Sequence, residues 1–146
     1  MMEAAEIQSF LCGLPFMLDL PESLKQRVGT IFEDISDLET IDEGTELFRE
    51  GDSRSEDGYI VLSGSVRVEK SYAKSSNAYA PVLLDEVKQF NPSSKRTATV
   101  TAREELAALH FDWTKFNNAV HARLDSTDQD VVRKALLGYA WLHLLN

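Results

Sequence analysis

The sequence predicts one mainly β domain, an antiparallel β roll with helices on both sides of it in the chain. Two observations predict this fold class. Before about Leu38 the apolar residues recur at helical spacing, and after it the spacing changes to two. The region that follows is then divided by glycines into short segments, as turns divide strands, at positions 44, 51, 58 and 64.

The whole chain, residues 1–146, is therefore expected to form one domain. Its length fits a single hydrophobic core, and a hydrophobic content of 43% is enough to build one. Within it we expect N-terminal helices at 1–36, a β roll at 37–111 and C-terminal helices at 112–146.

The N-terminal region is expected to contain two short helices, at residues 6–20 and 21–35. Pro15 and Pro21 mark breaks or first-turn positions. The second helix has one apolar face, made of Leu24, Val28, Ile31 and Phe32.

The central region reads as short strands joined by turns. Apolar residues alternate on both sides of Ser63 and Gly64, which predicts a tight hairpin at that point. A polar stretch at residues 71–81 is expected to be a loop. Further strands are expected at residues 82–84, 96–102 and 106–111.

The C-terminal region reads as two helices. Asp112 is placed to cap the first, and Ser126 opens the second. The second helix almost lacks a polar face after Lys134, so we expect it either to pack deeply or to pair with a partner helix. Its apolar residues are Val131, Val132, Ala135, Leu136, Leu137, Tyr139, Ala140, Trp141, Leu142, Leu144 and Leu145.

Charge is unevenly distributed, although the formal net charge of the chain is −9. Residues 1–60 hold 15 acidic and 4 basic side chains, a net −11, whereas residues 61–146 hold 9 acidic and 11 basic ones, a net +2. An acidic first half repels nucleic acid and anionic membranes, and a mildly basic second half can hold a small anion. We therefore expect neither nucleic acid nor a membrane as partner.

The chain is expected to be cytoplasmic. Cys12 is the only cysteine, so no intramolecular disulfide can form. The first six residues are acidic, where a signal peptide is basic. No apolar run approaches the roughly 18 residues that a membrane span needs.

Four segments, in order, resemble the cyclic nucleotide-binding domain family over roughly residues 7–120. The first is Phe10-Leu11-x-x-Leu14-Pro15-Phe16, and the second is Gly44-x-x-Leu47-Phe48-x-Glu50-Gly51-Asp52. The third is Asp57-Gly58-Tyr59-Ile60-Val61-Leu62-x-Gly64-x-Val66-x-Val68, and the fourth is Arg96-Thr97-Ala98-Thr99-Val100-x-Ala102. The resemblance implies an antiparallel β jelly roll whose C-terminal helix acts as a lid and a dimer contact.

The resemblance also implies a ligand, cAMP or cGMP, and the residues that hold it. In the family an arginine pairs with the cyclic phosphate and a glutamate accepts a hydrogen bond from the ribose hydroxyl. The corresponding candidates are Arg96 with the adjoining Thr97 and Ala98 for the phosphate, and Glu86 for the ribose. Thr97 could also donate to a guanine base, and Lys88 and Lys95 flank Arg96 as a local basic patch.

The phosphate-binding cassette of the family is degenerate in this chain. The family places Phe-Gly-Glu and a short helix before the arginine, and its glycine lets backbone amides approach the phosphate. In one alignment Glu86, ten residues before Arg96, is the ribose glutamate and Asp85 replaces the glycine. In the other, which we favour, residues 84–87 are a strand and the helix is deleted. Losing two charged hydrogen bonds of about 1.5–3 kcal/mol each would weaken binding roughly 10²- to 10⁴-fold.

We therefore predict a non-catalytic regulatory, sensor or interaction module with lost or weakened nucleotide binding. The alternative is a functional cAMP- or cGMP-binding domain that acts through Arg96, Thr97 and Glu86. An enzyme and a metal site are not expected, because no catalytic pattern is recognisable and the histidines are too far apart to cluster. The three histidines are His110, His121 and His143.

No cofactor is expected apart from this possible ligand. We expect a homodimer through the C-terminal helix and a protein partner that the sequence does not identify. No helix-turn-helix, kinase or channel segment follows the last helix within the 146 residues, so any output is expected to act on a separate protein.

Overall fold

The computed structural model describes residues 3–145 except positions 54, 72, 85–94 and 97, and for residues 138–145 it describes the backbone alone. Its helices are α1 (Ala4–Cys12), the 3₁₀ helix η1 (Pro15–Asp19), α2 (Glu22–Ile35), α3 (Trp113–Arg123) and α4 (Ser126–Leu145). Its strands are β1 (Asp37–Ile41), β2 (Glu46–Phe48), β3 (Asp57–Ser63), β4 (Ser65–Glu69), β5 (Ser76–Tyr79), β6 (Val82–Leu84), β7 (Thr99–Ala102) and β8 (Leu106–Asp112).

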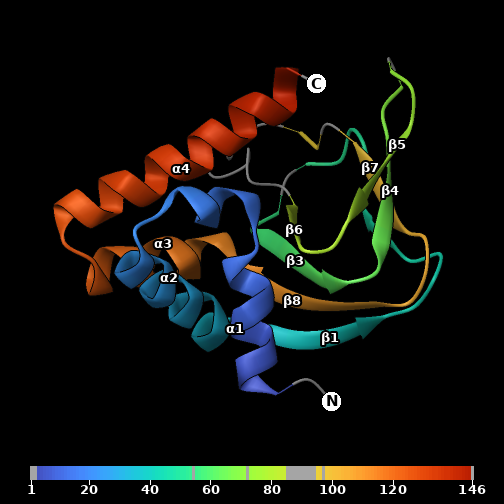
Figure 1. The fold of residues 1–146 in the computed structure, drawn as a ribbon. Helices are drawn as coiled ribbons and strands as arrows, with labels where there is room; N and C mark the ends of the chain where they lie inside the picture. The colour runs from blue at the N-terminus through green and yellow to red at the C-terminus, as the bar shows by residue number, and fades with distance from the viewer. Residues whose placement is uncertain (1–2, 54, 72, 85–94, 97, 146) are drawn as a thin grey trace.

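The strands form two antiparallel sheets of four strands each. One has the order β1-β8-β3-β6 and the other β2-β7-β4-β5. The helices lie on the outer side of the first sheet, and α4 runs across the top of this helical layer (Figure 1). The predicted fold class, an antiparallel β roll flanked by helices, is confirmed.

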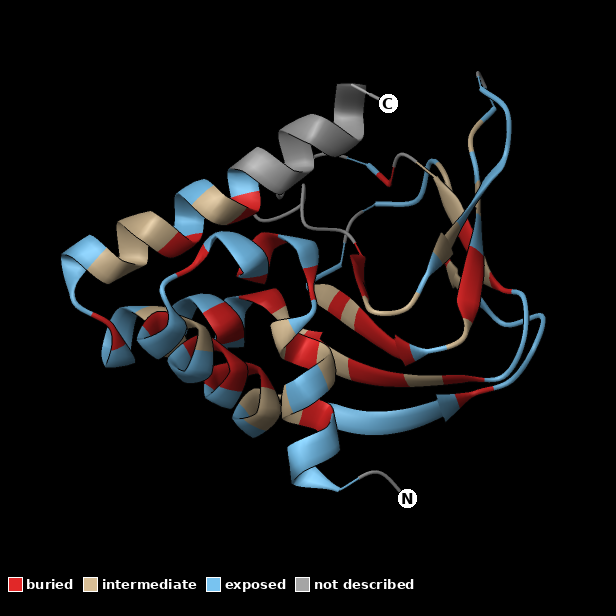
Figure 2. Cartoon of the chain, in the orientation of Figure 1, coloured by how far each residue is buried: buried red, intermediate tan, exposed pale blue. Residues whose placement is uncertain are grey.

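In the sheet β1-β8-β3-β6 the inner strand β3 is buried on both faces, which explains its continuous apolar sequence, whereas the edge strand β1 is mostly exposed. Ile60 and Leu62 of β3 point into the core beneath the helices, with Leu109 and Phe111 of β8. Val61 points the other way, into the core between the two sheets. Buried residues accordingly follow one another along β3 and β8 in Figure 2.

The predicted helix at 21–35 is correct and corresponds to α2, whereas the helix predicted before it needs correction. The predicted apolar face of α2 is buried, with Val28 and Phe32 both 0% exposed. The predicted helix at 6–20 is wrong as a single element. Its helical hydrogen bonds end at Gly13, whose amide donates to the Phe10 carbonyl, and η1 starts at Pro15, which has no amide hydrogen to donate.

The predicted hairpin around Gly64 is wrong, because the strands on its two sides belong to different sheets. β3 pairs with β6 and β8, whereas β4 pairs with β5 and β7. Gly64, at φ +100°, turns the chain from one sheet into the other. The predicted loop at 71–81 is also wrong in part, since β5 lies within it and pairs with β4.

Both C-terminal helices begin where the sequence predicts. The Asp112 carboxylate accepts hydrogen bonds from the amides of Thr114 and Lys115, at 2.8 and 3.1 Å. On α4, Val132 and Leu136 are buried, whereas Leu137 is 50% exposed. The last part of the predicted apolar helix, residues 138–145, lies outside the described side chains. None of the helices, over the residues described, combines the length and apolarity that a bilayer crossing requires.

Replacing Gly64 by alanine should destabilise the fold more than replacing Gly44. An added Cβ at Gly64 would lie 2.7 Å from Leu106 Cδ2 and 3.0 Å from the Glu105 carbonyl oxygen, whereas at Gly44 nothing lies within 4 Å. Both glycines have positive φ, so Gly44→Ala measures the backbone strain, about 1 kcal/mol. Gly64→Ala should cost about 2–4 kcal/mol. Urea unfolding of both variants checks this, and equal losses would contradict the close approach.

Candidate functional site

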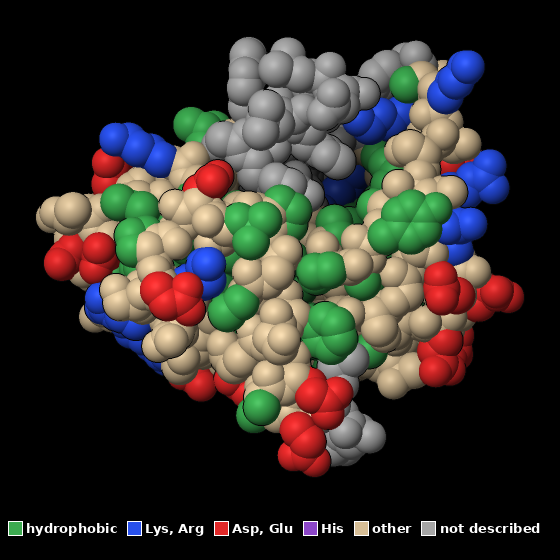
Figure 3. Space-filling view, in the orientation of Figure 1, with side chains coloured by type: hydrophobic (Ala, Val, Ile, Leu, Met, Phe, Trp, Pro, Cys, Tyr) green, Lys and Arg blue, Asp and Glu red, His purple; other side chains and the backbone are tan. Residues whose placement is uncertain are grey.

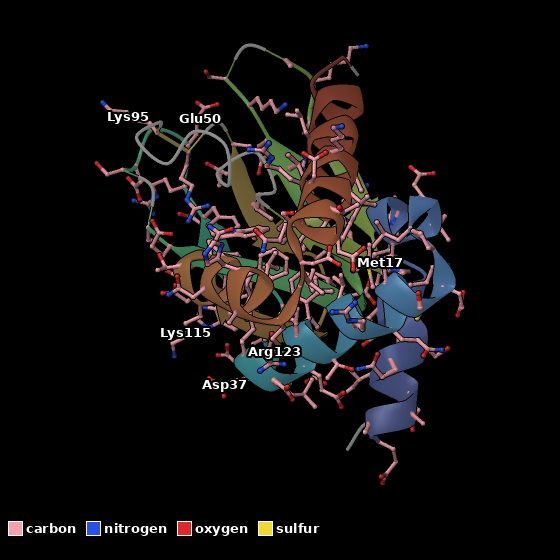
Figure 4. All side chains as sticks on the ribbon, turned by 90° about the vertical axis from the view of Figure 1, so that its left-hand side faces the viewer. Met17, Asp37, Glu50, Lys95, Lys115 and Arg123 are labelled. Atoms are coloured by element: carbon pink, nitrogen blue, oxygen red, sulfur yellow. The ribbon has the colours of Figure 1, made fainter. Side chains whose placement is uncertain are left out.

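Arg96 is held in place by the turn between β2 and β3. The Arg96 amide donates to the Asp52 carbonyl, and the Gly51 amide donates to the Arg96 carbonyl, both at 2.9 Å. Gly51 has φ +89°, which glycine adopts without strain, and this lets the turn present both groups. Lys95 forms an isolated β-bridge with Ser53 and lies at the same end of the roll as Glu50 (Figure 4).

The Arg96 side chain is directed into the protein, where only 6% of the residue is exposed. Its guanidinium carbon lies 3.8 Å from the centre of the Phe48 ring, a cation–π contact. Its Nη2 donates to Ser55 Oγ at 3.0 Å. A buried cation is costly unless it is paired or hydrogen-bonded, so these contacts stabilise an inward guanidinium.

A small polar cavity of about 210 Å³ lies beside this guanidinium. Small-molecule sites usually measure about 300–1,000 Å³, so the cavity is small for a nucleotide. Its lining carries three carboxylates and two guanidinium groups, which gives a formal net charge of −1. It is lined by Glu46, Leu47, Phe48, Arg49, Asp52, Ser53, Ser55, Asp57 and Arg96.

The charged side chains that line the cavity come more often from loops than from strands. The Arg49 guanidinium Nε donates to Glu46 Oε1 at 2.6 Å, so one of the two cavity arginines is paired with one of the cavity acids. On the face drawn in Figure 3, acidic side chains gather along the lower and lower-right edges and Lys and Arg side chains at the upper right.

A continuous chain of polar contacts leads from Arg96 across the sheet β1-β8-β3-β6, and we call it the Arg96 network. Ser55 Oγ accepts from Arg96 and donates to Asp57 Oδ2 at 2.8 Å. Asp57 Oδ1 lies 2.9 Å from His110 Nε2, and His110 Nδ1 lies 2.7 Å from Glu39 Oε2. The network thus consists of Arg96, Ser55, Asp57, His110 and Glu39.

His110 is placed at the centre of this network by strand register. It pairs with Tyr59 of β3, and the two rings stack at 4.5 Å with an interplanar angle of 10°. His110 lies on the face of β8 opposite Leu109 and Phe111, which point toward the helices, and its side chain is 31% exposed. Tyr59 in turn packs edge-on against Phe48, at 5.5 Å, which connects the His110 ring to the ring beneath Arg96.

Protonation of His110 is favoured by its two carboxylate neighbours. Burial by itself lowers the pKa of His110, but the hydrogen bond to Asp57 and the charges of Glu39 and Asp57 outweigh it, so the pKa is raised above 6.5. A neutral imidazole has only one N–H, so it can donate to only one of the two carboxylates that flank it. The imidazolium donates to both.

The same charges shift the pKa values of two neighbours of His110, Asp57 and Tyr59. Burial raises the pKa of Asp57, but the hydrogen bonds from His110 and Ser55 and the charges of His110 and Arg96 lower it overall. Burial raises the pKa of Tyr59, and the charges of Asp57 and Glu39 raise it further. Asp57 therefore stays ionised at neutral pH beside Arg96.

Ser55, Asp57 and His110 are residue types of a nucleophilic triad but are connected in a different order. In a triad the serine hydroxyl donates to the histidine, which the aspartate orients. Here Ser55 donates to Asp57, so the carboxylate lies between serine and imidazole, and the hydroxyl bonds to the carboxylate instead of the imidazole. Among the residues that the structure describes, no group of three or more His, Cys, Asp or Glu is arranged to hold a metal ion.

The structure describes two of the four predicted ligand residues. Arg96 is buried as given above, and Ala98 is half-buried next to the start of β7. Glu86 and Thr97 lie outside the described residues, as does Lys88. The predicted strand at 96–102 begins only at Thr99, because the backbone of Arg96 bonds to the turn at Gly51–Asp52.

Other residues of the site were not predicted from the sequence. Ser55, Glu39 and His110 come from segments far apart in the chain, and only the pairing of β1 and β3 with β8 brings them together. Asp57 begins the third segment that resembles the family, but no role is predicted for it from the sequence. Its alternation with Tyr59, which places both on one face of β3, was the available signal.

Replacing His110 by glutamine should change how stability depends on pH. Because the pKa of His110 is raised in the folded protein, its contribution is complete below the unfolded value of about 6.5 and is lost as the pH rises through the folded value. The free energy of unfolding of the wild type should therefore fall over that window relative to His110→Gln. Urea titrations at a series of pH values test this. The exposed His121, replaced by glutamine, is the control and should keep the wild-type slope.

Solved structures with the same architecture are found by comparison. The sensor domain of the transcriptional regulator DNR from Pseudomonas aeruginosa superposes with a TM-score of 0.67 at 19% identity, covering 94% of this chain and 92% of that one. The regulatory domain of Toxoplasma gondii PKA, solved with cAMP, gives a TM-score of 0.62 at 21% identity, covering 80% and 44%. A protein from Ruegeria pomeroyi, provisionally named a cyclic nucleotide binding protein, gives 0.70 at 14% identity, covering 99% and 62%.

Sequence comparison alone does not reach this relationship. No protein-family model matches the chain, and no curated protein matches it significantly. The chain spans less than two thirds of the length of the Toxoplasma and Ruegeria proteins. The resemblance inferred from the four sequence segments is confirmed by the structural matches at the level of the fold: the chain has the fold of the cyclic nucleotide-binding domains.

Proposed function

We propose that this chain is a non-catalytic regulatory or sensor module of the cyclic nucleotide-binding type whose affinity for cyclic nucleotides is weak. One observation supports this most directly. Arg96, the residue expected to pair with the cyclic phosphate, is buried against Phe48 and hydrogen-bonded to Ser55, with Asp57 ionised nearby. The guanidinium thus has partners of its own.

A cyclic phosphate would have to compete with these partners. The negative charge of Asp57 lies within the electrostatic reach of Arg96 and offsets part of the attraction that an incoming anion would feel. The remaining acids of the cavity, Glu46 and Asp52, act in the same direction. A competing carboxylate weakens binding without preventing it, because the arginine keeps its full charge.

The second candidate function is regulation by tight binding of cAMP or cGMP through Arg96, Thr97 and Glu86. The position of Arg96 favours this candidate, since its side chain lines the cavity that a ligand would enter. The two candidates differ in affinity and in the ligand range, not in the location of the site.

Titration calorimetry with cAMP and with cGMP tests the proposal. We expect dissociation constants weaker than about 10 μM, and a further loss of at least about tenfold in Arg96→Ala, because a charged hydrogen bond contributes about 1.5–3 kcal/mol. Arg67→Ala is the control, since Arg67 is an exposed arginine on β4 outside the cavity, and it should bind as the wild type does. Submicromolar binding that Arg96→Ala abolishes would favour the second candidate.

We also propose that a regulatory output involves self-association through α4. Leu137 is half exposed on this helix, although its neighbours Val132 and Leu136 are buried. Leu137→Glu should shift a dimer to a monomer in sedimentation velocity at high micromolar concentration, because it would bury a charge in an apolar contact. Leu18→Glu, at an exposed leucine on η1, is the control. A wild type that stays monomeric at this concentration would contradict the proposal.

A further inference from the structure

His110 and Arg96 are connected through two intermediates, Asp57 and Ser55. Arg96 donates to Ser55, Ser55 donates to Asp57, and the other oxygen of Asp57 lies 2.9 Å from His110 Nε2. One carboxylate oxygen of Asp57 therefore accepts from the hydroxyl that binds Arg96, and the other faces a titratable ring. A change in the charge of His110 therefore alters the electrostatic environment of the Asp57 carboxylate, whose charge in turn interacts with Arg96.

The charged and titratable groups facing His110 come from each strand beside it. On β1, Glu39 contacts Nδ1 of His110, and Asp37 is the residue that pairs with His110 in the strand register. Asp57 and Tyr59 face it from β3. On β8 itself, Asp112 lies two residues further on and is engaged by the amides at the start of α3. Among the described residues named here, the charged groups around His110 are therefore carboxylates, apart from Arg96 beyond Ser55.

The net charge of the Arg96 network depends on one proton. With His110 neutral, the carboxylates of Asp57 and Glu39 outnumber the single positive charge of Arg96. With His110 protonated, the two carboxylates and the two cations balance. Protonation of His110 thus makes the surroundings of Arg96 more positive by one charge, which favours an approaching anion, and charges in a partly buried site are weakly screened.

We propose that protonation of His110 controls the affinity of the Arg96 cavity for anions, so that the cavity binds a phosphate or sulfate group more tightly when His110 is protonated. The inference rests on the proposed function in one respect, that Arg96 is the contact for the anion. Because the pKa of His110 is raised by its carboxylate neighbours, the switch acts at a higher pH than the titration of an unperturbed histidine. By reciprocity, a bound anion raises the pKa of His110 further.

The test compares anion binding on the two sides of the His110 titration. Sulfate and cAMP are suitable probes, because neither changes its charge between about pH 5.5 and about pH 8.5, the range around the histidine titration. Both should bind the wild type roughly fivefold more tightly at the lower pH, a coupling at the low end of the usual range. Binding is measured by calorimetry, and the His110 ring is titrated by NMR with and without sulfate.

Two variants identify the group responsible. His110→Gln should remove the pH dependence, because glutamine cannot gain a proton. His121→Gln, an exposed histidine on α3, should keep it. If His110→Gln does not fold, the NMR titration of the wild type decides alone, since a His110 pKa that saturating sulfate leaves unchanged overturns the inference.

The outcomes separate this inference from the proposed function. Sulfate binding that depends on pH through His110, without any cAMP or cGMP binding, supports the inference and contradicts the nucleotide part of the proposed function. Binding with equal affinity at both pH values overturns the inference and leaves the proposed function in place. A protein that binds neither anion at either pH contradicts both.

Discussion

The burial of one positive charge, that of Arg96, constrains the charged residues of the whole cavity. The guanidinium lies over Phe48, which belongs to one sheet. It also bonds to Ser55, two residues before Asp57, where the strand β3 of the other sheet begins. A buried cation needs such partners, and an acidic partner needs its own compensation. His110 supplies that compensation, and its remaining nitrogen is bound to Glu39. The network therefore crosses one sheet and touches the other through the contact of Arg96 with Phe48.

This arrangement separates the fold of the chain from the chemistry of its cavity. The two sheets and the helical layer match structures that are named for cyclic nucleotide binding or regulation. The arginine of the cavity, however, is compensated from within, by a hydroxyl that accepts from it, by an aromatic ring and by the charge of a nearby carboxylate.

Much of the fold could be predicted from the sequence, since periodicity reports which side of an element is apolar. The buried face of α2 and the capping of α3 by Asp112 were both predicted correctly. The errors have a common origin. Gly64 was assigned to a hairpin because alternation on both sides of a glycine does not reveal whether the two strands share a sheet. Ser76–Tyr79 was assigned to a loop because an edge strand with little buried surface carries little apolar signal.

The sequence by itself determined the fold class and most of the order of the elements, because local spacing and residue type carry that information. Only the tertiary structure decided which residues surround Arg96. Glu39, Asp57 and His110 meet through the register of three strands, and register depends on contacts between segments separated by many residues. The charge balance of the cavity is a sum over these neighbours, so it can be known only once their positions are.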